Sequence, residues 1–355
     1  MAMWFGSKSD PIGVDLGRSS LKLAQVSCAG GQPRLSAAAT VEVPESLRAS
    51  SNGPHQLLRD AVEPALAKNG FRGRRVVLGM PASCMHIDRL RLPASLSEEQ
   101  MRQTVAWEAV DRLPFHPSRA MLRHLIAGEV HEANELRSEV ILLAARNDLT
   151  ESLLDAARRA KLDVIGFVPE PLALMGGFAR TGAAAQAQTT RAVVDIGHGA
   201  TRLYIARGKL IEFARSIGIG WNHLDANATR PAGEAQSTAG GDSSGGATTA
   251  VLQAQKPATA IAPEPLRRLV RELSMSCHYH AETFPNSPVA EAVVVGGVAT
   301  DRRLVAHLSA MLGVPVRGGD PLSPFGPQSA RSAGGGIPSR PEWAVAIGLS
   351  LSHAA

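Results

Sequence analysis

The sequence of 355 residues is poor in cysteine, in aromatic residues and in long apolar runs. Its three cysteines, Cys28, Cys84 and Cys277, lie far apart and form no Cys-x-x-Cys pair, so neither a disulfide framework nor a cysteine-based metal site is indicated. Aromatic residues make up only 4% of the chain. The cores should therefore consist mainly of Leu, Val, Ile and Ala.

No stretch reaches the roughly 18 consecutive apolar residues of a membrane-spanning helix. Residues 1–11 also lack the apolar core of a signal peptide. We therefore expect a soluble protein, so that any membrane location would have to come through a partner. The net charge is +5, but the basic residues are scattered and no aromatic residues interleave with them, which argues against a nucleic-acid partner.

Two similar hairpins are predicted near the start and the middle of the chain. Residues 12–17 and 20–26 read as two strands joined by a tight turn. Residues 191–196 and 201–207 repeat this pattern, with apolar-apolar-Asp-apolar-Gly before a turn of small residues. The match indicates an internal repeat and hence two related lobes.

The turns of these hairpins are candidate phosphate-binding loops, because successive backbone N–H groups in a tight turn form an anion nest. Two nests from two lobes could hold the β- and γ-phosphates from both sides. A Gly pair after a predicted strand at 292–295 would let the backbone approach a flat ligand closely. The predicted nucleotide-binding residues are Asp15, Gly17, Ser19, Ser20, Lys22, Gly197, Thr201, Gly296 and Gly297.

Two aspartates and one glutamate are the candidate catalytic and metal-binding residues. Mg²⁺ keeps several waters and takes only one or two carboxylates, so Asp15 and Asp195 could hold it through those waters. Glu170 could orient an attacking water for in-line phosphoryl transfer, which makes Glu170 and Asp195 the predicted catalytic pair. Each feature also has a plainer interpretation: an Asp that caps a turn, or an acid favoured by a helix start.

The rest of the chain alternates between predicted strands and helices. Ser97 and Gln100 indicate a capping box at the start of one helix, and Asp148 and Glu151 indicate a second. The further predicted elements are a helix at 54–69, strands at 75–81, 85–92 and 140–145, a helix at 264–282, a loop at 317–340 and a closing helix at 342–351. Residues 225–262 are rich in Ala, Gly, Ser and Thr and read as a low-complexity insertion.

In this order, the elements resemble the actin-like ATPase superfamily, and most closely the PilM family of type IV pilus assembly proteins. Sugar kinases, chaperones and actins do not share the stretch 92–115, which is the most specific part of the resemblance. The residues that carry it are 13–22, 92–99, 107–109, 114–115, 170–174, 194–197 and 296–297.

This resemblance implies an α/β, two-lobed actin-like fold of RNase H-like subdomains, with an extra α+β subdomain like that of the cell-division protein FtsA. It also implies a PilN-like membrane partner, whose cytoplasmic N-terminal tail would lie between the first lobe and the extra subdomain, and other inner-membrane pilus assembly proteins around a ring of copies. The implied parts are 1–30 with 162–190 and 340–355 as the first subdomain, 31–161 as the extra subdomain, and 191–339 as the second lobe.

Two departures from the family pattern leave hydrolysis open. Arg18 and His198 stand in the two turns where the family usually has small residues. A slow ATPase and a nucleotide-degenerate scaffold of a pilus or related secretion system are both compatible with such turns. A metabolite kinase of the same fold is a third alternative, but it would need a further catalytic Asp.

Overall fold

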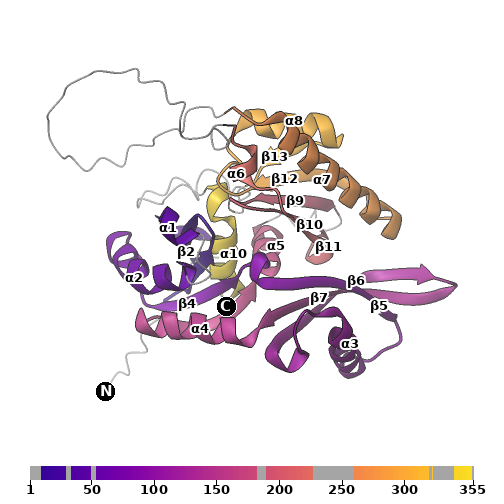
Figure 1. The fold of residues 1–355 in the computed structure, drawn as a ribbon, viewed down its shortest axis with the longest axis horizontal. Helices are drawn as coiled ribbons and strands as arrows, with labels where there is room; N and C mark the ends of the chain where they lie inside the picture. The colour runs from indigo at the N-terminus through magenta and orange to yellow at the C-terminus, as the bar shows by residue number, and fades with distance from the viewer. Residues whose placement is uncertain are drawn as a thin grey trace.

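The computed structural model describes residues 9–28, 33–48, 53–181, 189–226, 260–319, 322 and 340–353. These residues form three β-sheets with helices packed around them (Figure 1). Most of the predicted insertion at 225–262 and of the predicted loop at 317–340 lies outside the described residues.

The first five-stranded sheet has the strand order β3-β2-β1-β4-β8. Strand β1 pairs antiparallel with β2 and parallel with β4, and β4 pairs parallel with β8. Apolar side chains of α2 and α4 pack on one face of this sheet, and those of α10 pack on the other. The elements are β1 (Ile12–Leu16), β2 (Ser20–Ser27), β3 (Arg34–Glu42), α1 (Glu45–Arg48), α2 (Gly53–Lys68), β4 (Arg75–Met80), α4 (Asn147–Arg159), β8 (Asp163–Pro169) and α10 (Ala344–Ser352).

The second five-stranded sheet repeats this topology in the order β11-β10-β9-β12-β13. Strand β9 pairs antiparallel with β10 and parallel with β12, as β1 does with β2 and β4. Helices α7 and α8 cover one face of the sheet. The internal repeat predicted from the two hairpins thus extends to whole sheets. The elements are β9 (Thr190–Ile196), β10 (Thr201–Arg207), β11 (Leu210–Ile217), α6 (Trp221–Leu224), α7 (Pro263–Thr283), β12 (Val289–Val295), α8 (Arg302–Leu312) and β13 (Val316–Gly318).

Two helices, α5 (Glu170–Thr181) and α10, lie between the two sheets (Figure 1). Their backbones approach closely, because a Cβ added at Gly348 of α10 would lie only 1.9 Å from the carbonyl oxygen of Ala173 in α5. Buried apolar residues of both helices also pack against β9, β10 and β12. The α5–α10 pair therefore joins the two lobes. It also positions Glu170, which is the first residue of α5.

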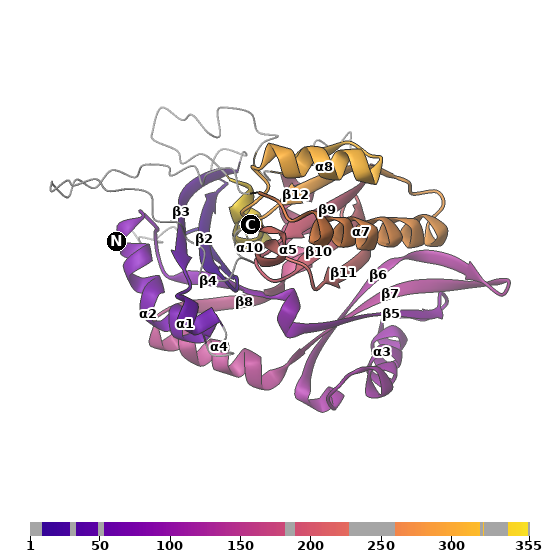
Figure 2. The same ribbon diagram turned by 45° about the horizontal axis from the view of Figure 1, so that its top comes forward.

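The third sheet has the order β5-β7-β6 and lies beside the second lobe (Figure 2). Its strands are β5 (Met85–Pro93), β6 (Ala120–Glu132) and β7 (Glu135–Arg146), and α3 (Glu98–Arg112) covers one face. The predicted capping box of Ser97 and Gln100 at the start of α3 is present. The guanidinium of Arg89 on β5 lies 5.1 Å from the ring centre of Phe213 and 4.1 Å from that of Tyr279, which connects this sheet to β11 and α7.

Two details differ from the sequence-based expectation. The residues predicted as one extra subdomain, 31–161, contribute to two sheets, because β3 pairs with β2 and β4 pairs with β1 before the third sheet begins. The capping box predicted at Asp148 and Glu151 is wrong. Helix α4 already begins at Asn147, and the carboxylate of Asp148 pairs with the side chain of Arg146 instead of capping the helix.

Candidate functional site

The first predicted hairpin holds a carboxylate and an ammonium group side by side. Asp15 on β1 and Lys22 on β2 are register partners across the two strands. The Nζ atom of Lys22 lies 3.4 Å from Oδ2 of Asp15, and both side chains are mostly buried. Gly17 and Ser19 lie in the turn between the two strands, and Ser20 is the first residue of β2. This hairpin therefore presents a paired charge next to its turn.

The second hairpin presents the same arrangement with an arginine. Asp195 on β9 and Arg202 on β10 are register partners, seven residues apart as Asp15 and Lys22 are. The Nη1 atom of Arg202 lies 3.0 Å from Oδ2 of Asp195. Arg202 is not among the site residues predicted from the sequence. Aligning the two hairpins residue by residue would have found it, since Arg202 stands where Lys22 stands.

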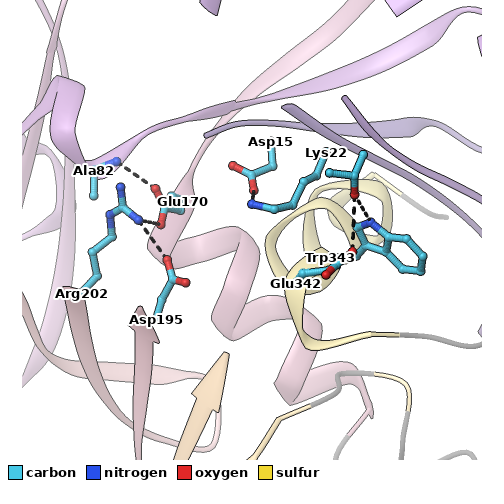
Figure 3. Close-up of polar contacts among 9 residues, drawn as sticks. Asp15, Lys22, Ala82, Glu170, Asp195, Arg202, Glu342 and Trp343 are labelled. Atoms are coloured by element: carbon cyan, nitrogen blue, oxygen red, sulfur yellow. Dashed lines mark hydrogen bonds and ion pairs between the residues drawn. The ribbon is translucent and has the colours of Figure 1, made fainter. Parts of the chain in front are cut away.

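Glu170 lies between the two hairpins, at the first residue of α5 (Figure 3). Its side chain is 4% exposed, and its Oε2 atom accepts a hydrogen bond of 3.0 Å from the backbone N–H of Ala82. Its Oε1 atom lies 3.2 Å from Nη1 of Arg202. Burial raises the pKa of Glu170 to about 8, although the charge of Arg202 opposes the shift. Glu170 is thus held by both lobes.

The charged groups of the two hairpins lie within electrostatic reach of one another. Burial on its own lowers the pKa of the Lys22 ammonium. The carboxylate of Asp15, and then those of Asp195 and Glu170, outweigh that effect and raise the pKa above its ordinary value. The pKa of Arg202 is likewise raised, because the carboxylates outweigh the effect of burial. Asp15 and Asp195 therefore belong to one cluster of charges.

The turns of the hairpins also approach each other directly. A Cβ added at Gly199 in the second turn would lie 3.7 Å from Nη1 of Arg18 in the first. The neighbouring imidazole of His198 has a lowered pKa, first because of burial and then because of the charges of Arg48 and Arg18. Cationic side chains therefore gather where the two turns meet.

The Gly pair after β12 lies against the second aspartate. Gly296 has φ +94, a conformation that favours glycine. A Cβ added there would lie 2.6 Å from the carbonyl oxygen of Ile196 and 3.0 Å from Oδ1 of Asp195. Gly297 faces open space, since an added Cβ would meet no heavy atom within 4 Å. This turn could therefore admit a flat ligand beside Asp195.

Two predicted phosphate contacts are already engaged within the protein. The hydroxyl of Thr201 is buried and donates a hydrogen bond of 2.7 Å to the carbonyl oxygen of Ile219. The backbone N–H of Gly197 donates to the carbonyl oxygen of Ala200 at 3.0 Å. Neither group is directed at a shared phosphate position in this arrangement. The cationic side chains, more than the second turn itself, are left to bind an anion.

The carboxylates fit a divalent ion only in competition with these cations. Within the described part of the chain, no three His, Cys, Asp or Glu side chains form a metal-binding group. Mg²⁺ does not need such a cage, because it keeps waters and uses one or two carboxylates. Asp15 and Asp195 are the two that would serve, but each already pairs with a cation, Lys22 or Arg202.

Comparison with known proteins agrees with this architecture. The family model described as type IV pilus assembly protein PilM matches residues 13–354. A solved PilM–PilN type IV pilus biogenesis complex is 22% identical over 98% of this chain and 99% of that chain, with a TM-score of 0.69. A Bacteroides thetaiotaomicron protein with an actin-like ATPase fold and unknown function is 10% identical, over 92% of this chain and 98% of that one, with a TM-score of 0.49.

The two-lobed actin-like fold predicted from the sequence is confirmed. Among the residues that the structure describes, no helix is both long and apolar enough to cross a membrane.

Proposed function

This chain belongs to the PilM family of type IV pilus assembly proteins, and from that premise we propose that it is an ATP-binding adaptor at the cytoplasmic face of the inner membrane. It would bind the cytoplasmic tail of a bitopic, PilN-like membrane protein. One observation carries the proposal: Asp15–Lys22 and Asp195–Arg202, from two related hairpins, lie in one electrostatic cluster around Glu170.

The charges of this cluster suit a nucleotide triphosphate. Lys22 carries a compact charge on a flexible stem that can reach a phosphate, and Arg18 adds a second mobile cation between the turns. The first turn, with Gly17, Ser19 and Ser20, offers backbone N–H groups and hydroxyls to the same anion. Gly297, which follows Gly296 and its contact with Asp195, leaves room for a flat base or ribose.

The same residues give a reason for slow turnover. Mg²⁺ bound with the nucleotide would neutralise phosphate charge, but Asp15 and Asp195 already pair with Lys22 and Arg202, so they would hold its waters only after these ion pairs open. Glu170, however, already accepts from Ala82 and pairs with Arg202, so it would orient an attacking water only after one of these contacts breaks. We therefore favour ATP binding as the function and regard hydrolysis as slow.

A chain of polar contacts supports coupling between the nucleotide and a partner. It runs from Asp195 through Arg202 and Glu170 to the backbone of Ala82. Ala82 begins the short 3-10 helix η1 (Ala82–Cys84), which leads directly into β5 of the third sheet. A change at the second hairpin would thereby reach the third sheet, beside which the tail of the membrane partner would bind.

The proposed partner follows from the family. The matched solved structure is a complex of PilM with PilN, and we propose an equivalent membrane protein as the ligand of this chain. Association into a ring beneath the pilus machine, with other inner-membrane assembly proteins, is part of the same proposal. The partner would also supply the attachment to the inner membrane.

Two titrations with the full chain test the adaptor function. A labelled peptide of the PilN-like N-terminal tail should bind, and saturating ATP should change its affinity. A scrambled peptide of equal composition is the control. Absence of binding by the tail peptide would refute the adaptor role, while absence of ATP binding would refute only the nucleotide role.

A nucleotide-degenerate secretion scaffold is the second candidate, because specific contacts favour it. Arg18 lies against Gly199 between the turns, and the hydroxyl of Thr201 is engaged with Ile219. In that case the tail peptide would bind and ATP would not. Among the residues that the structure describes, no observation supports a metabolite kinase.

A further inference from the structure

Arg202 occupies a position between two carboxylates that belong to different lobes. Its Nη1 atom lies 3.0 Å from Oδ2 of Asp195 on β9 and 3.2 Å from Oε1 of Glu170 at the start of α5. The Arg202 side chain is only 16% exposed. Figure 3 shows the guanidinium directed at both acids, with Asp15 and Lys22 on the other side of Glu170.

We propose that the guanidinium of Arg202 takes the place of a divalent cation at Asp195 and Glu170, so that ATP binding by this chain depends little on Mg²⁺. The inference deepens the proposed function and rests on it for the nucleotide, but its claim about the two carboxylates can be tested without ATP.

Asp195 and Glu170 are acids that the fold largely buries. Buried carboxylates are costly unless a cation compensates them. A divalent ion shared by acids of the two lobes would provide that compensation. Here the polypeptide provides it permanently, because a guanidinium remains protonated at every physiological pH and its planar fork can face two acids at once. A metal ion next to Arg202 would meet electrostatic repulsion at short range.

The two hairpins differ in how firmly they hold their cations. Lys22 lies 3.4 Å from a single partner, Asp15, and its ammonium is a point charge on a flexible stem, so it can move to a phosphate. Arg202 faces two acids at shorter distances and is fixed by both. Lys22 therefore suits phosphate binding, whereas Arg202 suits the role of a resident counter-charge.

A second observation favours an anionic ligand beside Arg202. Its Nε atom is buried and has no hydrogen-bond partner, and the hydroxyl of the neighbouring Tyr204 is in the same situation. Both atoms can donate, but both are buried, so a phosphate oxygen would satisfy them only through a bridging water. The guanidinium would keep its two acids and meet the nucleotide through that water, where a metal would otherwise mediate the contact.

The experiment compares wild type with Arg202→Met, which keeps the length of the stem and removes the charge. Arg207→Met is the matched control, because Arg207 also lies on β10 and pairs with a buried glutamate, Glu212, at 3.0 Å. ATP affinity is measured with excess Mg²⁺ and with excess EDTA. Melting temperature of the nucleotide-free protein is measured with and without millimolar Mg²⁺ at pH 8.5, where the Glu170 carboxyl, whose pKa is raised to about 8, is mostly ionised.

Wild type and Arg207→Met should bind ATP with affinities that differ by less than about 3-fold between Mg²⁺ and EDTA, and Mg²⁺ alone should not raise their melting temperature. Arg202→Met should require Mg²⁺, with an affinity difference of about 10-fold or more, and Mg²⁺ alone should stabilise it, because Asp195 and Glu170 are then uncompensated.

Either of two results overturns the inference: an ATP affinity of wild type that falls more than about 10-fold in EDTA, or a melting temperature of folded Arg202→Met that Mg²⁺ does not raise. If Arg202→Met does not fold, the comparison of wild-type ATP affinity in Mg²⁺ and in EDTA decides. Arg202→Lys, which keeps one positive charge, then replaces Arg202→Met in the melting experiment. If wild type binds no ATP under either condition, the proposed nucleotide function fails, and the Mg²⁺-only melting curves still judge the role of Arg202.

Discussion

The protonation of Glu170 makes a prediction that unfolding experiments can test directly. Its carboxyl is buried, and burial raises its pKa from the ordinary value of 4.5 to about 8. The perturbation is Glu170→Gln, which removes the titration and keeps the size of the side chain. We expect the stability of wild type to depend on pH, relative to this variant, through the neutral range.

The sign follows from proton linkage. A carboxyl with a raised pKa binds its proton more tightly in the folded chain than in the unfolded chain. Its contribution is therefore fully present below pH 4.5 and is lost as the pH rises towards 8. One pKa unit corresponds to about 1.4 kcal/mol, so wild type should lose about 2 kcal/mol between pH 6 and pH 8 from this one group.

The assay is denaturant unfolding of wild type and Glu170→Gln at a series of pH values between 6 and 8, in steps of about half a unit. The amide places a donor opposite Arg202, which costs about 1–3 kcal/mol at every pH, so a constant offset between the curves is not the test. The slope is the test. Parallel curves for wild type and variant would refute the raised pKa and with it the electrostatic description of the site.

Three further predictions address the site, the junction of the lobes and the third sheet. Lys22→Ala should weaken ATP binding sharply, by about 10-fold or more, with unchanged far-UV circular dichroism; an unchanged affinity in a direct titration would contradict the assignment. Gly348→Ala should destabilise the protein by about 3 kcal/mol, because the new Cβ would lie 1.9 Å from a backbone oxygen, whereas Gly176→Ala, which faces open space, should be neutral or stabilising by about 0.5–1 kcal/mol. Arg89→Ala should lower the melting temperature by removing a guanidinium that lies over two aromatic rings, a loss of about 1–2 kcal/mol, and equal melting curves would show that this contact does not hold the third sheet.

The sequence was sufficient to predict the repeated architecture. A motif of two apolar residues, Asp, one apolar residue and Gly occurs twice. Alternation of apolar and polar residues identifies the second strand of each hairpin. The sheets confirm this, since β1–β2 and β9–β10 occupy equivalent positions. The order of apolar and polar residues is a local property of a strand, and for that reason it can be read from a single sequence.

Features that depend on distant partners were not predictable in the same way. The first sheet recruits β3 and β4 through pairings with β2 and β1, and no local signal distinguishes these strands from those of the third sheet. Asp148 has the right type and spacing for a helix cap, but the neighbouring Arg146 pairs with its carboxylate. In both cases a competing partner, unknown at the level of pattern, decided the outcome.

The acid–cation pairs illustrate the same limit within the site. Lys22 was identified because it follows a recognisable motif, yet its equivalent, Arg202, becomes meaningful only once the fold places it between Asp195 and Glu170. One hairpin thus keeps a lysine paired with one acid, and its repeat keeps an arginine paired with two. Because the arginine also connects, through Glu170, to the backbone of Ala82, the residue that distinguishes the two hairpins is the one that joins the second lobe to the third sheet. Divergence between the repeats is therefore located where the proposed nucleotide site and the proposed partner site would communicate.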